Sequence, residues 1–509
     1  MLKRALIFVH RWLGIALCLL FLLWFPSGIG MMYFPMPSVT PTARFERLPI
    51  LDASKLMVSP GEAATKLGVD AEDLTLTSFD GRPAYRVGGD RGGGGPVLYA
   101  DTGEEQGEVS NEMVQRLAST WTGQPVSTAS VEEISDVDQW TLQSRIADLS
   151  PLFKFSWPNG EQVYVSQSSG EVVQYTTTAS RVGAYLGPIP HWFYFTPLRK
   201  HGLQWSRVVI WSSGIGTIAA IIGVVIGIWM YSPSRKYRYA GAPTSIPYRG
   251  QKRWHTVIGL IFGVATVTYA FSGMLSMDPF PSLNDRVQQR RNPGGEPNIR
   301  AALRGDLDPA AFEAKHPRQV LEQLGELQVK ELDLMAFDGE AMYLARLADG
   351  DTRVIPMHGD PRTGFDQKDI VRIVSAAADG RMTTRVLNQY DRYYLDRTRQ
   401  RPLPVILAEG TTGQQTRYYI DPKTARIVQT YDSSNWVNRW LYNGLHSLNF
   451  PWLYNYRPLW DIVVITLMLG GTALCVTSLI LAWRVLGRKL ARVLNVNNTR
   501  EPALSEDLA

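Results

Sequence analysis

The sequence predicts a membrane α-helical protein, with four transmembrane helices in two parallel repeats and two extracytoplasmic α+β domains. Three observations lead to this fold class: four long apolar runs, an uneven distribution of charge, and an internal duplication. The chain has 509 residues, of which 45% are hydrophobic and 19% are charged. These averages are typical of a soluble protein. However, the apolar residues are concentrated in four runs, which excludes a soluble enzyme.

Each apolar run is long enough for a membrane-spanning helix, which needs about 20 residues. The runs cover residues 6–33, 208–231, 256–277 and 462–483. The first run exceeds the apolar core of a signal peptide, is interrupted by His10 and Arg11, and lacks a small-residue cleavage site. We therefore expect it to be retained as a helix. Trp and Tyr residues near the ends of the runs are typical of an interfacial aromatic belt.

Charge divides the chain into two populations, which together with Arg11 give a formal net charge of +5. Thirteen basic and three acidic residues lie in the N-terminus, the loop between the second and third runs, and the C-terminal tail. Apart from Arg11, the two long segments hold the remainder, 38 basic and 44 acidic residues. The positive-inside rule therefore places both termini and the loop in the cytoplasm and the long segments outside. The basic excess indicates topology, and no nucleic acid partner is expected.

The predicted domain boundaries follow from this division. We expect a multi-pass protein of the bacterial inner (plasma) membrane, surrounded by membrane lipid, with cytoplasmic termini and two large periplasmic domains. Both cysteines, Cys18 and Cys475, lie in apolar runs, so disulfides are not expected to hold the external domains together.

The predicted parts of the chain are the N-terminus with helix 1 (1–33), domain A (34–206), helix 2 (207–231), a basic loop (232–254), helix 3 (255–277), domain B (278–459), helix 4 (460–484) and the cytoplasmic tail (485–509).

Self-similarity along the chain indicates that one unit of helix, external domain and helix occurs twice. Three nearly equal offsets, 245, 255 and 258 residues, align the two halves in the same order. Both copies start in the cytoplasm, visit the outside and return, so their equivalent residues can face each other across an axis along the membrane normal. The aligned positions include His10 with His255, Ser27 with Ser272, Phe79 with Phe337, His191 with His446, and Trp205 with Trp460.

The external segments read as α+β domains, with a helix packed on an antiparallel sheet. Pro60–Leu67 is predicted to be a short helix with Ser59 as its N-cap. Alternating stretches between turn residues predict strands at 84–87, 97–100, 162–166, 172–176, 417–420 and 426–430. The glycine-rich stretch 88–95 is interpreted as a hairpin tip, because it lacks the lysine and the strand-to-helix context of a phosphate loop.

Four of the seven histidines form two repeat-equivalent pairs, His10 with His255 and His191 with His446. Two imidazoles that meet across the repeat axis can supply both axial ligands of a b-type haem. One such site near each face would give electrons a path across the bilayer, and ionisable groups in membrane segments are usually functional. A lone interfacial histidine can also merely hydrogen-bond or anchor in the headgroups. No catalytic residue is assigned.

The remaining polar residues give weaker signals. No cluster of His, Cys, Asp or Glu has the spacing of a zinc site. His201 aligns with Tyr456 and its role stays open, whereas His316 and His358 are expected at the surface. Basic residues near the pairs, such as Arg11 and Lys252, can bind haem propionates or act as interfacial anchors.

Two segments resemble the opening helix of the PepSY-associated transmembrane proteins: HRWLGIALCLLFLLWFPSG at 10–28 and HTVIGLIFGVATVTYAFSG at 255–273. The patterns around Gly61–Lys66 and Asp421–Thr424 resemble PepSY domains, and Leu445–His446 resembles the entry into the family's later helix. That family includes iron-regulated inner-membrane proteins and siderophore reductases that bind two haems through histidines near opposite faces. The resemblance implies that His10, His191, His255 and His446 are axial ligands of haem iron.

The resemblance also implies a function, namely a di-haem b-type electron-transfer protein, which as an enzyme would be a haem-dependent reductase of the ferric-siderophore type. Both external segments are long, so the acceptor can be another ferric chelate. No cytoplasmic nicotinamide or flavin domain is found, which leaves a quinol or a separate cytoplasmic protein as electron donor. The alternative is a non-enzymatic PepSY-domain membrane protein that binds or regulates an extracytoplasmic peptidase or envelope protein. A transporter ranks third, because only Pro26 indicates a broken helix.

Overall fold

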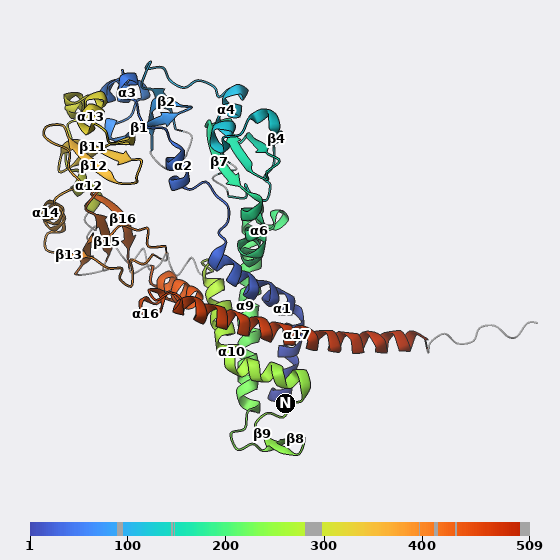
Figure 1. Cartoon of the computed structure of the whole chain (residues 1–509). Coiled ribbons are helices and arrows are strands. Elements are labelled where there is room, and N and C mark those ends of the chain that lie inside the picture. The colour runs from blue at the N-terminus through green and yellow to red at the C-terminus, as the bar shows by residue number, and fades with distance from the viewer. Residues whose placement is uncertain are drawn as a thin grey trace, which may run out of the picture. The chain divides into compact units, whose positions relative to one another are not determined.

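The computed structural model describes residues 1–88, 95–143, 146, 148–279, 298–396, 398–411, 416–432 and 435–498. The chain forms two compact units, coloured by residue number in Figure 1. The helical unit contains residues 1–36, 182–281 and 437–509, and the β-sheet unit contains residues 37–181 and 282–436. Most of the glycine-rich stretch 88–95 lies outside the described residues.

Four long helices run through the helical unit: α1 (Leu2–Tyr33), α9 (Gly202–Met230), α10 (Gly250–Leu275) and α17 (Leu459–Asn498). All four are long and apolar enough to cross a membrane, in α17 over Leu459–Ala491. This confirms the four apolar helices predicted from the sequence. Each begins several residues before its apolar run, because a helix that has formed gains a backbone hydrogen bond for every residue added. The basic residues Lys252 and Arg253, expected in a loop, therefore lie in the first turn of α10.

Close packing of the helices depends on glycines where they meet. α9 packs along α10, and α1 packs along α17. A Cβ atom on Gly216 would lie 2.7 Å from the ring of Phe21, and one on Gly471 would lie 2.5 Å from the ring of Phe25. Small residues at such contacts allow close approach in a membrane, where lipid gives no hydrophobic drive for helix association. These two glycines therefore fix where the two phenyl rings sit.

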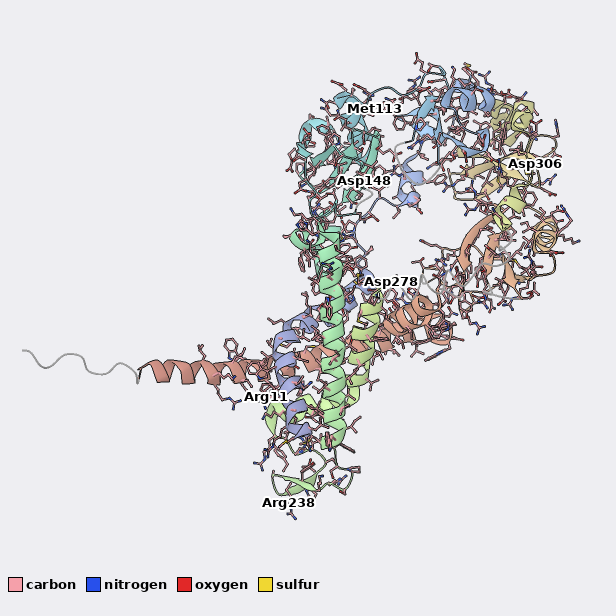
Figure 2. The ribbon with its side chains drawn as sticks, turned by 180° about the vertical axis from the view of Figure 1, so that it is seen from behind. Arg11, Met113, Asp148, Arg238, Asp278 and Asp306 are labelled. Atoms are coloured by element: carbon pink, nitrogen blue, oxygen red, sulfur yellow. The ribbon has the colours of Figure 1, made fainter. Side chains whose placement is uncertain are left out.

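The basic loop and the N-terminus share one end of the helical unit. The loop forms a hairpin of β8 (Tyr237–Tyr239) and β9 (Ala242–Thr244), which lies near the N-terminus in Figure 1. The Lys3 ammonium lies 5.4 Å from the centre of the Trp229 ring at the end of α9. Figure 2 labels Arg238 on the hairpin and Asp278 beyond the opposite end of α10.

The β-sheet unit has the same order of elements in both halves: a short helix, three strands, a longer helix, then four strands. Three short helical pieces, α2 (Pro41–Arg47), η1 (Ala53–Lys55) and η2 (Ala71–Asp73), accompany the first half, and α12 (Ile299–Arg304) and η5 (Pro309–Ala314) the second. The first half has α3 (Pro60–Leu67), β1 (Leu74–Phe79), β2 (Arg82–Val87), β3 (Val97–Tyr99), α4 (Asn111–Thr122), η4 (Val126–Thr128), β4 (Ser130–Ile134), β5 (Leu152–Ser156), β6 (Gln162–Ser166) and β7 (Glu171–Thr176). The second half has α13 (Pro317–Leu324), β10 (Val329–Phe337), β11 (Glu340–Leu347), β12 (Thr352–Pro356), α14 (Gln367–Ala378), β13 (Met382–Leu387), β14 (Val405–Gly410), β15 (Arg417–Asp421) and β16 (Arg426–Tyr431).

The two halves share one sheet, which no signal in the sequence predicted. Six antiparallel strands run in the order β12-β11-β10-β1-β2-β3, and β4–β7 and β13–β16 each form a separate four-stranded sheet. At the junction Thr75 pairs with Asp333, the residue 258 positions further along, and the Thr75 hydroxyl donates to the Asp333 carboxylate at 2.9 Å. The Thr77 hydroxyl donates to Glu331 at 3.1 Å. These bonds satisfy carboxylates that would be costly to bury unpaired.

Local signals predicted several of these elements at their observed bounds. α3 covers the predicted Pro60–Leu67, and the Ser59 side chain accepts the Glu62 backbone N–H, as an N-cap does. The strand at 162–166 is confirmed as β6. The strands β2, β7, β15 and β16 extend the predicted stretches by one or two residues.

A buried ionic cluster around Glu171 stabilises the first half of the β-sheet unit. Glu171, on β7, is 4% exposed and accepts hydrogen bonds from Arg44 of α2 at 2.8 Å and from Arg86 of β2. Replacing Glu171 with Gln removes the charge between two guanidinium groups, so we expect about 3 kcal/mol lower local stability. Hydrogen exchange of the β7 and α2 amides in the full chain measures this loss.

The matched control for Glu171 is an exposed pair. Asp369 and Arg372 lie 3.3 Å apart with more than half of each side chain exposed. Asp369→Asn is expected to change stability by less than about 1 kcal/mol. Equal protection in both variants would show that the Glu171 cluster does not hold α2 against β7.

Candidate functional site

The four candidate histidines lie in the helical unit as two facing pairs. His10 of α1 faces His255 of α10, with ring centres 6.3 Å apart. His191 lies on α7 (Pro188–Trp192) and His446 on α15 (Leu445–Ser447), with ring centres 5.9 Å apart. We call these the His10 pair and the His191 pair. Each pair joins residues that are equivalent in the two halves of the sequence.

Short helices position the His191 pair. α7 follows α6 (Thr178–Leu186) and precedes α8 (Thr196–Arg199), whereas α15 follows a π-helix, η7 (Val437–Gly444), and precedes α16 (Pro451–Tyr454). The Trp205 indole donates to the Trp192 carbonyl at 2.7 Å, and the Trp460 indole donates to the Ser447 carbonyl at 2.9 Å. Each indole thus ties the end of a histidine-bearing helix to the long helix that follows. π-Helical turns often occur at functional sites.

The hydrogen bonds of the His10 pair define the protonation of both rings. His10 Nδ1 lies 3.0 Å from the carbonyl oxygen of Ala219, which can only accept, so this nitrogen carries the hydrogen. His255 Nδ1 lies 3.1 Å from the Thr477 hydroxyl and 3.4 Å from the Ser478 hydroxyl. Both hydroxyls donate their own hydrogen to the Leu474 carbonyl. They therefore accept from His255, whose Nδ1 also carries the hydrogen.

The His191 pair has the same arrangement. His191 Nδ1 lies 3.2 Å from the Trp24 carbonyl oxygen and 3.3 Å from the Ser27 hydroxyl, and His446 Nδ1 lies 3.1 Å from the Ser272 hydroxyl. Ser27 donates to the Leu23 carbonyl and Ser272 to the Thr268 carbonyl, each from its only hydroxyl hydrogen. Both serines therefore accept from Nδ1–H of the histidine.

In all four rings Nε2 is left with a free lone pair. Among the residues that the structure describes, none makes a hydrogen bond to these Nε2 atoms. Metal-binding histidines have this form, with one nitrogen donating to a backbone carbonyl or a polar group and the other binding the metal. Two rings that bind one metal ion through Nε2 have centres about 6 Å apart, since each bond is about 2 Å and each ring centre lies about 1 Å further back. Both pairs match this distance.

The two pairs lie at different depths along the same helices. His10 and Ser27 are 17 residues apart on α1, and His255 and Ser272 are 17 residues apart on α10. Seventeen residues of α-helix span about 25 Å. The hydrocarbon core of a bilayer is about 30 Å thick. The distance between the His10 pair and the His191 pair along these helices is therefore close to the thickness of the hydrocarbon core.

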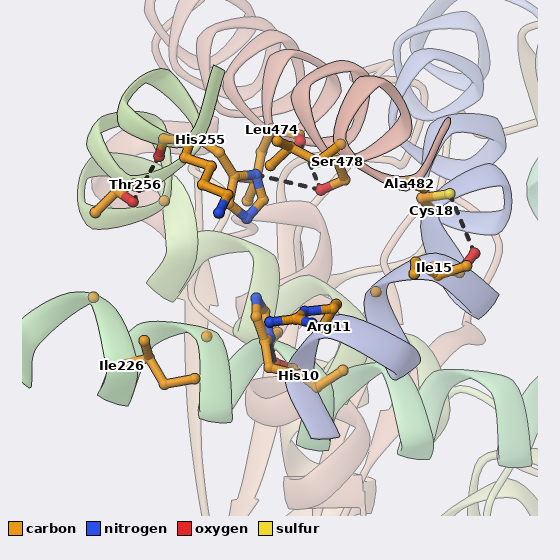
Figure 3. Close-up of a pocket in the computed structure, with 18 of the residues that line it drawn as sticks. His10, Arg11, Ile15, Cys18, Ile226, His255, Thr256, Leu474, Ser478 and Ala482 are labelled. Atoms are coloured by element: carbon orange, nitrogen blue, oxygen red, sulfur yellow. Dashed lines mark hydrogen bonds between the residues drawn. The ribbon is translucent and has the colours of Figure 1, made fainter. Parts of the chain in front are cut away.

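A cavity of about 680 Å³ surrounds the His10 pair. Figure 3 shows the rings of His10 and His255 on opposite sides of this cavity, with Cys18 further along α1. The lining along α1 begins at Ile7 and ends at Phe21. Gly14 and Gly259, each one turn after a histidine, also line the cavity, and a Cβ atom on Gly14 would meet no atom within 4 Å. The volume lies within the range of cofactor sites.

The charges around this cavity have one sign. Arg11, Lys252, Arg488 and Lys489 line it, and no acidic residue does so in the described part of the chain. Because a cluster of cations attracts anions, the cavity suits an apolar ligand with carboxylate groups. The protein thus offers metal ligands inside the cavity and anion partners along its wall.

The other three histidines lie elsewhere. His201 is the exposed N-cap residue of α9, and His358 is exposed as predicted. His316 is half-buried and caps α13, where its side chain accepts the Arg318 backbone N–H. His316 is therefore a helix-capping residue, whereas we expected only a surface residue. The described residues include no group of three or more His, Cys, Asp or Glu side chains able to hold a metal ion.

Sequence reasoning missed the groups that accept from the histidines. Ser27 and Ser272 were aligned by the repeat, but no role was assigned to them. Thr477, Ser478 and the Ala219 carbonyl gave no sequence signal, because a hydrogen bond between different helices depends on how they pack. The only available signal was that two small polar residues recur one position before Gly28 and Gly273.

Two facing histidine pairs among four apolar helices, with a separate β-sheet unit, define an integral membrane protein with two candidate cofactor sites. The family described as the PepSY-associated TM region matches residues 8–324. This match covers more than half of the chain, so the protein belongs to that family, which confirms the resemblance seen in the sequence. A comparison with curated proteins found no match.

Proposed function

We propose that the protein is a di-haem b-type electron-transfer protein of the bacterial inner membrane. His10 and His255 hold one haem near the cytoplasmic face, and His191 and His446 hold the other near the periplasmic face. Electrons cross the membrane to a periplasmic acceptor such as a ferric siderophore or chelate. One observation carries this proposal: all four rings donate from Nδ1, and they face each other in pairs at the spacing that a shared iron ion needs.

A bound haem supplies one-electron redox chemistry, and the chain supplies its binding, orientation and electrostatics. The acceptors at Nδ1 hold each ring in one orientation and make Nε2 a stronger ligand. Arg11, Lys252 and the other basic lining residues pair with haem propionates. Within this scheme a quinol or a separate cytoplasmic protein donates electrons.

The finer architecture of the proposal is two parallel repeats, each with one PepSY-like periplasmic domain. The support is the common order of elements and the equivalent contacts in the two halves. Trp205 and Trp460 make the same bond 255 positions apart, and Thr75 pairs with its own equivalent, Asp333, in the shared sheet. Parallel repeats bring equivalent histidines together at the axis between them.

The visible spectrum of the purified chain tests the proposal. Protein made in haem-replete cells is expected to show a Soret band, an α band on reduction with dithionite, and two haems per chain by pyridine haemochrome assay. A colourless preparation from such cells would contradict it. Passage of electrons to an external ferric chelate is then tested in vesicles with a reductant on the other side.

Removing a hydrogen-bond acceptor from a histidine is expected to weaken haem binding without abolishing it. Ser272→Ala removes the hydroxyl that accepts from His446 Nδ1–H and leaves the Tyr269 backbone as the remaining acceptor. Loss of such partners typically costs about 10- to 100-fold in metal affinity. Haem transfer to an excess of apomyoglobin measures the effect. Ser276→Ala is the matched control, because Ser276 caps the end of α10 one turn after Ser272, and its hydroxyl donates to the Gly273 carbonyl and contacts no histidine in the described part of the chain.

A cavity in the β-sheet unit favours a second candidate function. It measures about 360 Å³ and is lined by polar and aromatic side chains that include Arg47, Trp121 and Glu331. In this alternative the β-sheet unit binds or regulates a peptidase or another envelope protein, and the helices only anchor it. A haem-free protein that is stable in detergent and binds such a partner would favour this function.

A further inference from the structure

The rings of Phe21, Phe25 and Tyr269 form a continuous column between the two histidine pairs. The centres of Phe21 and Phe25 are 6.2 Å apart, those of Phe25 and Tyr269 are 6.3 Å apart, and those of Tyr269 and His446 are 5.9 Å apart. At its other end Phe21 lines the cavity of the His10 pair. The column therefore begins where that cavity ends and finishes on a histidine of the other pair.

The column lies in the interior of the helical unit. Phe21 is 9% exposed, Phe25 is 4% exposed and Tyr269 is 6% exposed. Gly216 of α9 and Gly471 of α17 lie directly against Phe21 and Phe25, where any Cβ atom would collide with the ring. These glycines are repeat equivalents, 255 positions apart, yet the residues equivalent to Phe21 and Phe25 are Thr266 and Ala270. Only one copy supplies the phenyl rings, so duplication of a packing pattern does not account for them.

The Tyr269 side chain has an unusual hydroxyl. Its oxygen is buried and has no hydrogen-bond partner among the described residues. A buried hydroxyl without a partner is unfavourable, so no hydrogen bond of this hydroxyl accounts for the position of the ring. The ring of Tyr269, in contrast, contacts both Phe25 and His446. Trp24 also contacts Phe21, but on its other side its ring meets Phe193 and not a histidine.

We propose that Phe21, Phe25 and Tyr269 form the tunnelling medium that carries electrons between the two histidine pairs. This inference rests on the proposed function. With haem bound at both pairs, one electron would pass from a reduced iron held by His10 and His255 to an oxidised iron held by His191 and His446, and the rings of the column would be neither oxidised nor deprotonated. Tunnelling falls steeply across gaps and is faster through closely packed atoms with delocalised electrons. The interior packing of the column removes such gaps.

The test removes one ring at a time and keeps the volume of the side chain similar to that of the original residue. Phe25→Leu and Tyr269→Leu break the column, whereas Phe25→Tyr and Tyr269→Phe keep every ring. Phe262→Leu is the matched control: Phe262 also packs against a glycine of α17, Gly470, and has no ring contact among the described residues. Each full-length variant is placed in nanodiscs, and its haem content and two midpoint potentials are measured first.

The measured quantity is the rate at which an electron equilibrates between the two haems after photoreduction by a ruthenium complex. We expect Phe25→Leu and Tyr269→Leu to slow this rate several-fold with both haems and both potentials retained. The ring-keeping variants and Phe262→Leu are expected to match the parent protein. If the column were purely structural, the Leu substitutions would change the unfolding temperature or the haem content but would leave this rate unchanged.

Two results would overturn the inference and leave the proposed function in place. The first is parent-like equilibration in Phe25→Leu and Tyr269→Leu with both haems bound. The second is equal slowing in Tyr269→Phe, which would assign the effect to the hydroxyl. If the parent protein binds no haem, the proposed function fails as well, so the two failures are distinguishable. Because Phe25 and Tyr269 lie on different helices, the test remains available if one Leu variant does not fold.

Discussion

Replacing His446 with alanine is expected to remove one haem from each chain and leave the other in place. The His446 ring is fixed by Ser272 and faces His191 with ring centres 5.9 Å apart, so its loss leaves the iron one axial ligand short in a buried site. The His10 pair lies about 25 Å away along α1 and shares no ligand with it. Pyridine haemochrome assay of the purified variant should therefore give one haem per chain in place of two.

The paired geometry gives this prediction a sharper form. Removing His191 should have the same effect as removing His446, and the double variant should lose no more than either single one, because both act on the same iron. His316→Ala is the control, since His316 caps α13 in the β-sheet unit. If His446→Ala retained both haems with unchanged low-spin spectra, the His191 pair would not be a haem site.

The sequence predicted those parts of the fold that depend on local signals. Apolar runs located the four long helices, and Ser59 with Pro60 located the start of α3. The shared sheet could not be predicted in this way. Pairing of β1 with β10 joins Thr75 to Asp333 across 258 positions, and an edge strand gives no local sign of its partner. The start of α9 at Gly202 was also missed, because polar residues before the apolar run continue the helix.

The candidate site was predicted to a similar extent and for similar reasons. The repeat alone selected His10, His191, His255 and His446 from seven histidines, and the structure brings them together in the expected pairs. What the repeat could not give is the state of each ring. The proton position at Nδ1 depends on the Ala219 and Trp24 carbonyls and on four hydroxyls, which only helix packing brings into reach. The aromatic column likewise depends on contacts between helices.

Replacing Gly14 with valine is expected to displace the haem of the His10 pair without destabilising the protein. Gly14 lies one turn after His10 and lines the cavity, and a Cβ atom added to it would have no atom within 4 Å. A valine side chain therefore enters open space in the chain itself but occupies volume that the macrocycle needs. Overpacking of this kind costs about 1–3 kcal/mol, which corresponds to a roughly 5- to 150-fold higher Kd for haem. Haem titration of the apoprotein measures it.

A control at Gly487 distinguishes a cavity that haem occupies from an empty space between helices. Gly487 of α17 also has no atom within 4 Å of an added Cβ, but it does not line the cavity. Gly487→Val should leave the affinity for haem unchanged. Both substitutions replace a helical glycine, so neither is expected to lower the unfolding temperature of the apoprotein. If Gly14→Val bound haem at the His10 pair as tightly as Gly487→Val, the macrocycle would not lie against Gly14, and the cavity would have to serve another ligand. If both lost haem equally, the loss would reflect glycine replacement in the helices and not occupation of the cavity.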